Sequence, residues 1–419
     1  MPDQLFDHNR ATRTIIYFPF LDSNLILSNM LLSVIIVSYN VRYFLRQCLD
    51  SLFRSCDAAA VNVEVFVVDN DSKDDSVAYL RESFPQQVKG SEDARLHLIA
   101  NRHNVGFGRA NNQALRQCSG DYVLFVNPDT ILTEHTILDC VNAAQKQRNL
   151  GAIGVAMLQA NGDFAPESRR GLPTPWVAFC KMVGLTKLFP KSRKFAHYYM
   201  SYLPQEEKAP IDIVSGAFMF CSRKALDTVG GFDEAFFMYG EDIDLSYRFL
   251  KAGFQNLFVP TPILHYKGES THKNSYRYVH VFYEAMLIFF QKHFPASSWA
   301  LRIPVRCAIY GRALLALLHQ TLSKWSQFLT PKKPTSQLQL RVMGTESLKS
   351  QWQEHADVWE LRLLREDETP TEVCYNGYSP EEKSYAEIVE DLRAASGKAY
   401  LATFFPSWEV MITGKEVFE

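Results

Sequence analysis

Residues 31–129 alternate between short apolar runs and stretches in which apolar residues recur with a helical period. The apolar runs cover residues 31–37, 63–68, 96–100 and 122–126. Helical spacing covers the residues between them, 43–53, 74–84 and 110–117. This strand–helix alternation is typical of a parallel α/β sheet with buried strands. We therefore predict an α/β fold.

Polar clusters stand where three of these predicted strands end. The clusters are Ser38-Tyr39-Asn40, Asp69-Asn70-Asp71-Ser72 and Asn127-Pro128-Asp129. The carboxyl ends of parallel strands meet at one edge of a sheet, and ligands of such sheets bind there. The sequence therefore predicts a binding site at that edge.

A further chemical feature is the stretch over residues 230–248, GGFDEAFFMYGEDIDLSYR. An aromatic run over 236–239 precedes Glu241 and Asp242, and apolar residues then recur four apart until Gly253. The pattern predicts a helix with acids in its first turn and a glycine at its end. Acids at a helix start can simply complement the helix dipole. Paired carboxylates beside aromatic rings also describe a sugar-binding cleft with a general base, and this stretch alone leaves both interpretations open.

The composition excludes several classes of protein. A net charge of −2 gives no electrostatic footprint for nucleic acid, so we expect no such partner. The eight cysteines are scattered without metal-site spacing, which indicates reduced thiols in a cytoplasmic protein. No run of 18 or more apolar residues lacks a charge, and we predict no membrane span.

Seven motifs in order resemble those of the family 2 inverting glycosyltransferases, especially the rhamnosyltransferase-like branch. They are SVIIVSYN (33–40), VVDNDS (67–72), NVGFGRANN (104–112), FVNPD (125–129), SGAFM (215–219), GGFDEAFFMYGEDIDLSYR (230–248) and HYKGES (265–270). The resemblance covers about residues 31–270. It implies a GT-A fold, which is a mixed, mostly parallel sheet with flanking helices. It also implies a nucleotide-sugar donor, a divalent metal and one displacement with inversion at the anomeric carbon.

The chain divides into four predicted parts. They are a leader over 1–29 that is disordered or precedes the true start, a GT-A catalytic domain over 30–270, a helical segment over 271–330, and a small α/β accessory domain over 336–419. The helical segment predicts either a helix lying on an anionic membrane surface or a helix packed on the catalytic domain. Residues 159–210 predict a long, irregular, basic loop. We expect donor hydrolysis to survive deletion of the accessory domain.

The resemblance implies a Mg²⁺ or Mn²⁺ site that neutralises the leaving diphosphate. Asp129 stands at the position of the metal ligand. Relatives often carry Asp-x-Asp there, whereas this chain has a single carboxylate after Asn127 and Pro128. A second ligand is therefore needed, and the resemblance points to His265, for which a structural, hydrogen-bonded role is the alternative.

The donor-binding residues implied by the resemblance come from the strand ends and the loop before the third helix. They are Ser38, Tyr39, Asn40, Asp69, Asn70, Gly106, Arg109 and Asn127. Asp69 and Asn70 would contact a uracil or thymine base, and Gly106 would allow close approach of the backbone to the donor. Arg109 would reach a phosphate, or would simply be solvated.

The acceptor hydroxyl must lose a proton during transfer, and a positioned base supplies roughly 10²–10⁴-fold in rate. The resemblance gives this role to Asp242, with Glu241 orienting the acceptor or supporting Asp242. Phe237 and Tyr239 would line the acceptor side, with buried packing as the alternative.

These inferences predict an inverting glycosyltransferase that moves rhamnose or another hexose from a dTDP- or UDP-sugar to a lipid-linked or polysaccharide acceptor in cell-surface glycan synthesis. We expect it in the cytoplasm, with the inner face of the membrane as a candidate partner. A catalytically inactive sugar-nucleotide-binding module is an alternative. A sugar nucleotidyltransferase is disfavoured, because its glycine-rich basic loop is absent after the first strand, where the chain reads Ser38-Tyr39-Asn40-Val41-Arg42.

Overall fold

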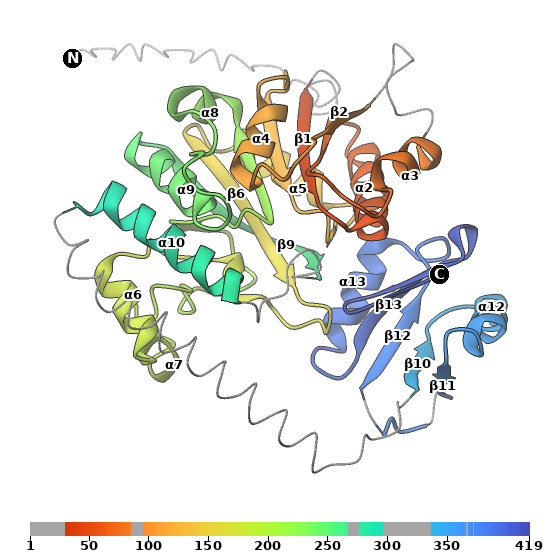
Figure 1. Cartoon of the computed structure of the whole chain (residues 1–419). Helices are drawn as coiled ribbons and strands as arrows, with labels where there is room; N and C mark the ends of the chain where they lie inside the picture. The colour runs from red at the N-terminus through yellow and green to blue at the C-terminus, as the bar shows by residue number, and fades with distance from the viewer. Residues whose placement is uncertain (1–29, 85–94, 267–275, 296–336, 366–367, 372) are drawn as a thin grey trace, which may run out of the picture.

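The computed structural model describes residues 30–84, 95–266, 276–295, 337–365, 368–371 and 373–419. The predicted leader, residues 1–29, lies outside this part of the chain. Two sheets with their own helices make up the described residues (Figure 1).

The larger sheet has the strand order β3-β2-β1-β4-β8-β6-β9-β5, and β7 pairs with β9. Its strands are β1 (Leu31–Ser38), β2 (Asn62–Asp69), β3 (Leu96–Ala100), β4 (Tyr122–Val126), β5 (Thr130–Ile131), β6 (Leu150–Leu158), β7 (Ala209–Ile211), β8 (Phe218–Ser222) and β9 (Gln255–His265). Strands β1 to β4 are parallel, β8 runs antiparallel to β4 and β6, and β9 runs parallel to β6. The predicted fold class, a mixed and mostly parallel sheet of the GT-A type, is confirmed.

Helices cover both faces of this sheet. They are α2 (Arg42–Ala58), α3 (Ser76–Ser83), α4 (Phe107–Leu115), α5 (Thr136–Gln145), α8 (Arg223–Val229) and α9 (Glu241–Lys251). Side chains of β1 alternate between the faces: Val34 and Ile36 pack in one core with α2 and α5, whereas Ile35 packs in another with α4, α8 and α9. Both faces of β1 are therefore buried, which explains its continuous apolar run.

The prediction of an irregular loop over 159–210 is wrong in part. This segment holds η1 (Pro166–Ser168), α6 (Pro175–Met182), α7 (Leu185–Leu188) and β7. Thr174 caps α6 by accepting a hydrogen bond from the Val177 amide at 3.3 Å, and Pro175 occupies the first turn. Both are ordinary signals of a helix start. They were not recognised in the sequence because α6 is short and is flanked by prolines.

Helix α10 (Tyr276–His293) lies over α6 and α9 (Figure 1). Its Ala285, Phe289 and Phe290 pack with Phe236 in a separate apolar cluster. The described part of the predicted helical segment is therefore a packing helix. The basic residues on which its membrane prediction rested, Arg302, Arg306, Arg312 and Lys324, lie outside the described residues. Among the described residues, no helix is long and apolar enough to cross a membrane.

The predicted small C-terminal α/β domain is confirmed as a second sheet with the order β11-β10-β12-β13-β14-β15. Its elements are β10 (Leu338–Val342), α12 (Glu346–Ala356), β11 (Leu361–Leu363), β12 (Cys374–Tyr378), α13 (Tyr385–Ala394), β13 (Tyr400–Phe405), η2 (Pro406–Trp408), β14 (Val410–Thr413) and β15 (Val417–Phe418). Strands β10 to β13 are parallel, and β14 and β15 are antiparallel additions.

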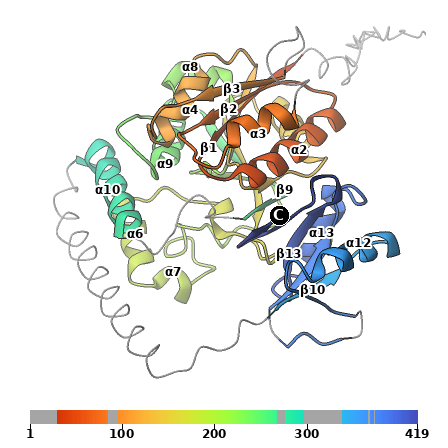
Figure 2. The ribbon, with the colours of Figure 1, turned by 45° about the vertical axis from the view of Figure 1, so that its right-hand side comes forward.

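The two domains share one apolar core, and α13 lies beneath α2 and beside β9 (Figure 2). Phe44, Leu264 and Tyr266 of the first domain pack in one cluster with α13 and β13. A buried hydrogen bond of 2.9 Å from Gln47 Nε2 to Thr403 Oγ1 crosses the same junction. The C-terminal domain is thus continuous with the base of the larger sheet.

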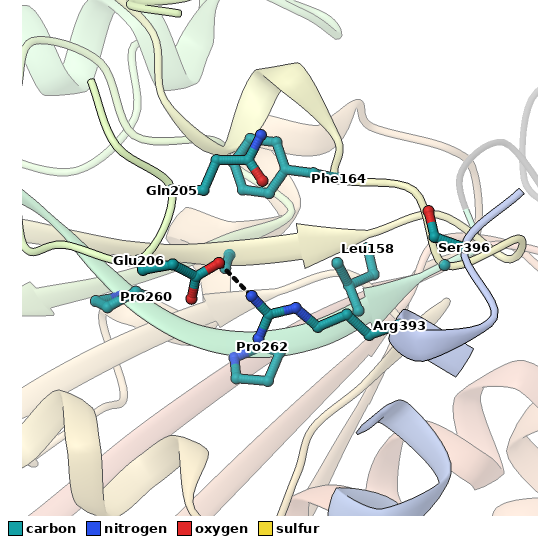
Figure 3. Close-up of a pocket in the computed structure, with 10 residues that line it drawn as sticks. Leu158, Phe164, Gln205, Glu206, Pro260, Pro262, Arg393 and Ser396 are labelled. Atoms are coloured by element: carbon teal, nitrogen blue, oxygen red, sulfur yellow. Dashed lines mark hydrogen bonds and ion pairs between the residues drawn. The ribbon is translucent and has the colours of Figure 1, made fainter. Parts of the chain in front are cut away.

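A small cavity of about 200 Å³ lies at this junction (Figure 3). The charged residues that line it, Glu206 and Arg393, form an ion pair with each other. Because the two charges satisfy one another, we assign this cavity no ligand.

Candidate active site

A cleft with a volume of about 480 Å³ opens at the carboxyl ends of β1 and β4. Tyr39, Asn127 and Asp129 reach it from the strand ends, and Asp242 reaches it from the first turn of α9. Helix α10 and residues 167–199 supply the opposite wall. The edge predicted to bind a ligand therefore does border a cleft.

Asp129 and His265 lie side by side because β5 pairs with the end of β9. Thr130 stands opposite His265 in that pairing, and the Tyr266 amide donates to the Asp129 carbonyl at 3.0 Å. Both side chains are nearly buried, and His265 Nε2 lies 3.3 Å from Asp129 Oδ1. Asn127 Nδ2 lies 3.4 Å from the same His265 nitrogen.

This pair fits a divalent cation. Adjacent ligands on an octahedral Mg²⁺ or Mn²⁺, each about 2.1 Å from the ion, stand about 3 Å apart, close to the 3.3 Å between His265 and Asp129. Within the described residues, no group of three or more His, Cys, Asp and Glu side chains could hold a metal. The protein would thus supply two ligands and leave the other positions to a bound phosphate and water.

Asp242 is held in place by several hydrogen-bond donors. Its Oδ2 accepts hydrogen bonds from the Arg170 guanidinium and from the Gly216 amide at 3.0 Å. Its Oδ1 accepts from the Ile243 amide at 2.8 Å. The Asp242 carboxylate therefore has a fixed orientation at the floor of the cleft.

Glu241 has a different environment although it is the adjacent residue. Burial, and then the negative charge of Asp242, raise the pKa of Glu241 to about 8. Its Oε2 is buried and has no hydrogen-bond partner among the described residues. At neutral pH, Glu241 is therefore a neutral acid with a proton to donate.

Asp244 points away from the cleft, into a cluster with Arg248, Lys292 and His293. The Asp244 carboxylate accepts from Arg248 Nε at 2.7 Å and lies 2.7 Å from His293 Nε2. Burial alone would raise the pKa of Asp244, but the hydrogen bond from Lys292 and the charge of Arg248 hold that pKa below its usual value. Asp244 therefore connects α9 to α10 through Lys292 and His293, and it does not face the cleft.

On the donor side, Asp69 and Ser38 are buried at the ends of β2 and β1 and are not among the residues that line the cleft. Asp69 Oδ2 accepts from the Ser72 amide at 3.1 Å, whereas Asp69 Oδ1 and Ser38 Oγ have no partner among the described residues. Tyr39 is exposed at 37% and lines the cleft.

Asn70 also lines the cleft, but its amide is occupied by the loop at residues 101–105. Its Nδ2 donates to Asn104 Oδ1 at 2.9 Å, and its Oδ1 accepts from the Val105 amide at 3.1 Å. Asn70 therefore fixes this loop in addition to facing the cleft.

Six predicted residues do not line the cleft: Ser38 and Asp69, described above, and Asn40, Gly106, Arg109 and Phe237. Arg109 is exposed and paired with Glu234 at 3.4 Å. Asn40 Oδ1 accepts from the Lys73 amide at 2.7 Å, which ties two loops together. Gly106 and Phe237 contact each other, and a Cβ on Gly106 would stand 2.7 Å from the Phe237 carbonyl. Glycine is therefore required at position 106 because its backbone packs against Phe237, whereas the predicted close approach was to the donor.

Sequence reasoning missed the residues that the segment 159–210 contributes. Glu167, Arg170, Lys181, Tyr198 and Tyr199 all line the cleft. A signal was present, because residues 168–205 hold seven Lys and Arg residues and no acid. A basic segment of this length is a candidate to face a phosphate-rich ligand.

Comparisons with known proteins bear on this cleft. A family model described as glycosyl transferase family 2 matches residues 33–230. The N-acetylglucosaminyl-diphospho-decaprenol L-rhamnosyltransferase of Mycobacterium tuberculosis (strain ATCC 25618 / H37Rv) is 28% identical over 297 residues, covering 68% of this chain and 91% of that protein. Rhamnosyltransferase WbbL of Escherichia coli (strain K12) is 28% identical over 165 residues, covering 37% of this chain and 58% of that protein.

Among solved structures, the chain is similar to the mannosyltransferase PcManGT from Pyrobaculum calidifontis in complex with GDP-Man and Mn²⁺. The sequence identity is 16% and the TM-score is 0.42, over 78% of this chain and 79% of that one.

Proposed function

Because residues 33–230 match the model described as glycosyl transferase family 2, we propose that the chain is an enzyme of this family that transfers a sugar, with inversion, from a nucleotide-diphosphate donor to a lipid-linked glycan acceptor. The observation that carries the proposal is the meeting of two acidic sites in one cleft. Asp129 with His265 forms the first site, and Glu241 with Asp242 forms the second. A leaving group and an attacking hydroxyl need two such sites.

Asp129 and His265 would hold Mg²⁺ or Mn²⁺ beside the diphosphate. The ion would neutralise the negative charge that develops on the leaving diphosphate. The buried carboxylate of Asp129 and the adjacent imidazole of His265 would hold the ion without a second aspartate.

Asp242 is proposed as the base that takes the proton of the acceptor hydroxyl. Each carboxylate oxygen has two lone pairs. Oδ1 uses one lone pair for the Ile243 amide, and a second remains for a proton. Arg170 and Gly216 hold Oδ2, so the group keeps one orientation during transfer.

Glu241 is proposed to orient the acceptor. With its pKa raised to about 8, it carries a proton at neutral pH and can donate a hydrogen bond to an acceptor oxygen. Tyr239 lines the same wall and would contact the acceptor sugar.

The donor nucleotide is proposed to be dTDP or UDP. Asp69 Oδ1 is a buried acceptor without a described partner, and the N3–H of thymine or uracil is a donor of matching kind. Tyr39, exposed at the cleft, offers a ring for stacking.

The lipid-linked acceptor and the rhamnose donor are supported by the name of the Mycobacterium tuberculosis relative, which contains both diphospho-decaprenol and L-rhamnosyltransferase. We propose a cytoplasmic location, because the cysteines of the described residues are free thiols and most are buried. The proposed role in cell-surface glycan synthesis rests on the name of the same relative.

A screen of the purified protein against dTDP-, UDP- and GDP-sugars, with and without Mn²⁺ or Mg²⁺, tests this proposal. We expect metal-dependent binding and slow hydrolysis of one pyrimidine donor. Binding without hydrolysis or transfer would favour the inactive binding module, and preference for a GDP-sugar would overturn the assignment of the base site.

A further inference from the structure

Helix α6 is apolar on two adjacent faces, one buried and one exposed. Val177 and Cys180 are buried on one face. Trp176, Phe179 and Val183 follow the i, i+3, i+7 spacing of the other face and are exposed at 46%, 45% and 49%. A surface helix ordinarily turns polar residues to water. The exposed apolar face of α6 is therefore unpartnered within the described structure.

The chain after α6 extends this apolar face. Leu188 is exposed at 69% and Phe189 at 45%. The ring of Phe195 joins the two parts, because its centroid lies 5.3 Å from that of Phe189 and 6.2 Å from that of Trp176. We call this the α6–α7 surface, which consists of the exposed residues Trp176, Phe179, Val183, Leu188 and Phe189.

Basic side chains border the α6–α7 surface. Lys187, Lys191, Arg193 and Lys194 are exposed, and none forms an ion pair with a residue that the structure describes. They belong to residues 168–205, which contain no acid in a chain whose net charge is −2. Local charge is therefore strongly positive where the protein as a whole is nearly neutral.

We propose that the α6–α7 surface docks the enzyme on a bilayer rich in anionic lipid. Exposed aromatic and aliphatic side chains bordered by Lys and Arg are the combination that binds the interface of such a membrane. Each basic residue near an anionic leaflet adds attraction, and the apolar side chains enter the boundary between headgroups and acyl chains.

The charge of this surface argues against two other occupants. Residues 296–336 carry six Lys and Arg residues and no acid, so they repel a positive surface. A second copy of the chain would place the same positive segment opposite itself. An anionic bilayer is the occupant with complementary charge.

The α6–α7 surface is continuous with the cleft. Lys181 of α6 lines the cleft, and its Nζ lies 3.5 Å from the ring centroid of Tyr198, which also lines it. Helices α6 and α7 stand at the outer edge of the first domain, below α10 (Figures 1 and 2). Docking there would place the cleft beside the membrane, and this consequence rests on the proposed use of a lipid-linked acceptor.

Flotation of the full chain with vesicles tests the docking surface without donor or acceptor. The vesicles are phosphatidylcholine alone, or phosphatidylcholine mixed with phosphatidylglycerol. We expect the wild type to bind the acidic vesicles and to release as salt rises. The triple variant K187E/K191E/K194E and the triple variant F179S/L188S/F189S should each bind at least about tenfold more weakly.

A matched control is K146E/R148E/K224E, which reverses three exposed charges outside the 168–205 segment and gives the same net charge. It should bind acidic vesicles like the wild type. All substituted residues are exposed, and melting temperatures verify that each variant is folded.

Three outcomes overturn the proposal. They are equal binding of the wild type to neutral and acidic vesicles, wild-type binding by both triple variants, and equal loss in the control. Light scattering that shows a wild-type dimer and monomeric triple variants would instead make this face an interface between copies. Donor hydrolysis is measured in parallel, so a failure of the proposed reaction and a failure of docking are separate results.

Discussion

At the scale of single residues, the site depends on two adjacent acids that the fold treats differently. Asp242 accepts hydrogen bonds from Arg170 and from two backbone amides. Glu241 is buried beside this charge, and its Oε2 has no described partner. Adjacent carboxyl groups in unlike environments are a recurrent way to divide acid and base roles in enzymes.

The raised pKa of Glu241 predicts a pH-dependent stability. The folded protein holds this proton up to about pH 8, whereas the ordinary pKa of a glutamate in an unfolded chain is 4.5. The contribution of Glu241 to the free energy of unfolding is therefore fully present below about pH 4.5. It decreases as the pH rises above that value and is lost once the pH has passed about 8. Glu241→Gln removes the ionisation, so its stability relative to wild type should rise between about pH 5 and about pH 9, by an amount on the order of a few kcal/mol.

Urea denaturation at both pH values measures this difference. Glu390→Gln, a change at an exposed position on α13, is the control and should show no such trend. A Glu241→Gln effect that is independent of pH would show that Glu241 ionises normally in the folded protein.

Several predicted side chains were brought together as the sequence indicated, because strand ends fix them. Tyr39, Asn127 and Asp129 follow apolar strands directly, and parallel pairing puts them at one edge. Arg170 could not be assigned in this way. Its contact with Asp242 joins residues 72 apart in the chain through an irregular segment, and no local pattern encodes that distance.

At the scale of elements, the start of α13 is capped by an acidic side chain of the first domain. Glu134 accepts hydrogen bonds from the Tyr385 amide at 2.9 Å and from the Ala386 amide at 2.8 Å. Ser384 and Glu387 form a capping box at the same helix start. The free amides of the first turn and the helix dipole are thus satisfied from two domains.

We expect Glu134→Ala to destabilise the protein by about 1–3 kcal/mol, since two amides at the helix start lose a charged acceptor. The measurement is the shift in denaturation midpoint relative to Glu390→Ala, which removes an exposed acid from the same helix. Equal midpoints for the two variants would mean that the capping box alone satisfies this helix start.

Elements whose apolar pattern has clear boundaries were predicted well, and those whose boundaries are hidden by prolines or by a continuous aromatic run were not. Strands β3 and β4 have the predicted bounds. Helix α6 has eight residues with prolines at its start, so its period is too short to recognise. Strands β13 and β14 were missed because the aromatic residues of 400–408 continue across the 3-10 turn between the strands, without glycine to mark it.

At the scale of the whole molecule, the C-terminal domain belongs to the structure of the first domain. Phe44, Leu264 and Tyr266 are buried in the cluster shared with α13 and β13. Tyr266 directly follows His265, and its OH donates to Gln47 Oε1 at 3.3 Å. The metal-ligand candidate therefore sits next to the junction of the domains.

From the sequence we expected donor hydrolysis to survive deletion of the C-terminal domain. The shared core leads us to expect instead that the deletion impairs the first domain. Deletion of residues 336–419 would expose the apolar residues of the junction and loosen the end of β9. We expect the remainder to aggregate or to bind donor at least about tenfold more weakly, a change of about 1.4 kcal/mol. Size-exclusion chromatography and donor titration measure this; a soluble, monomeric remainder with unchanged donor affinity would show that the domain is accessory.

The central claim is that Asp129 serves the donor and Asp242 serves the acceptor. The most direct measurement is donor affinity by calorimetry beside transfer rate on a defined acceptor, for Asp129→Ala and Asp242→Asn. Asp129→Ala should weaken donor binding and remove its dependence on the metal. Asp242→Asn keeps the shape but removes the basicity, so donor affinity should stay within a few-fold while transfer falls roughly 10²-fold or more. Near-normal transfer by Asp242→Asn, or loss of its donor binding, would contradict the account.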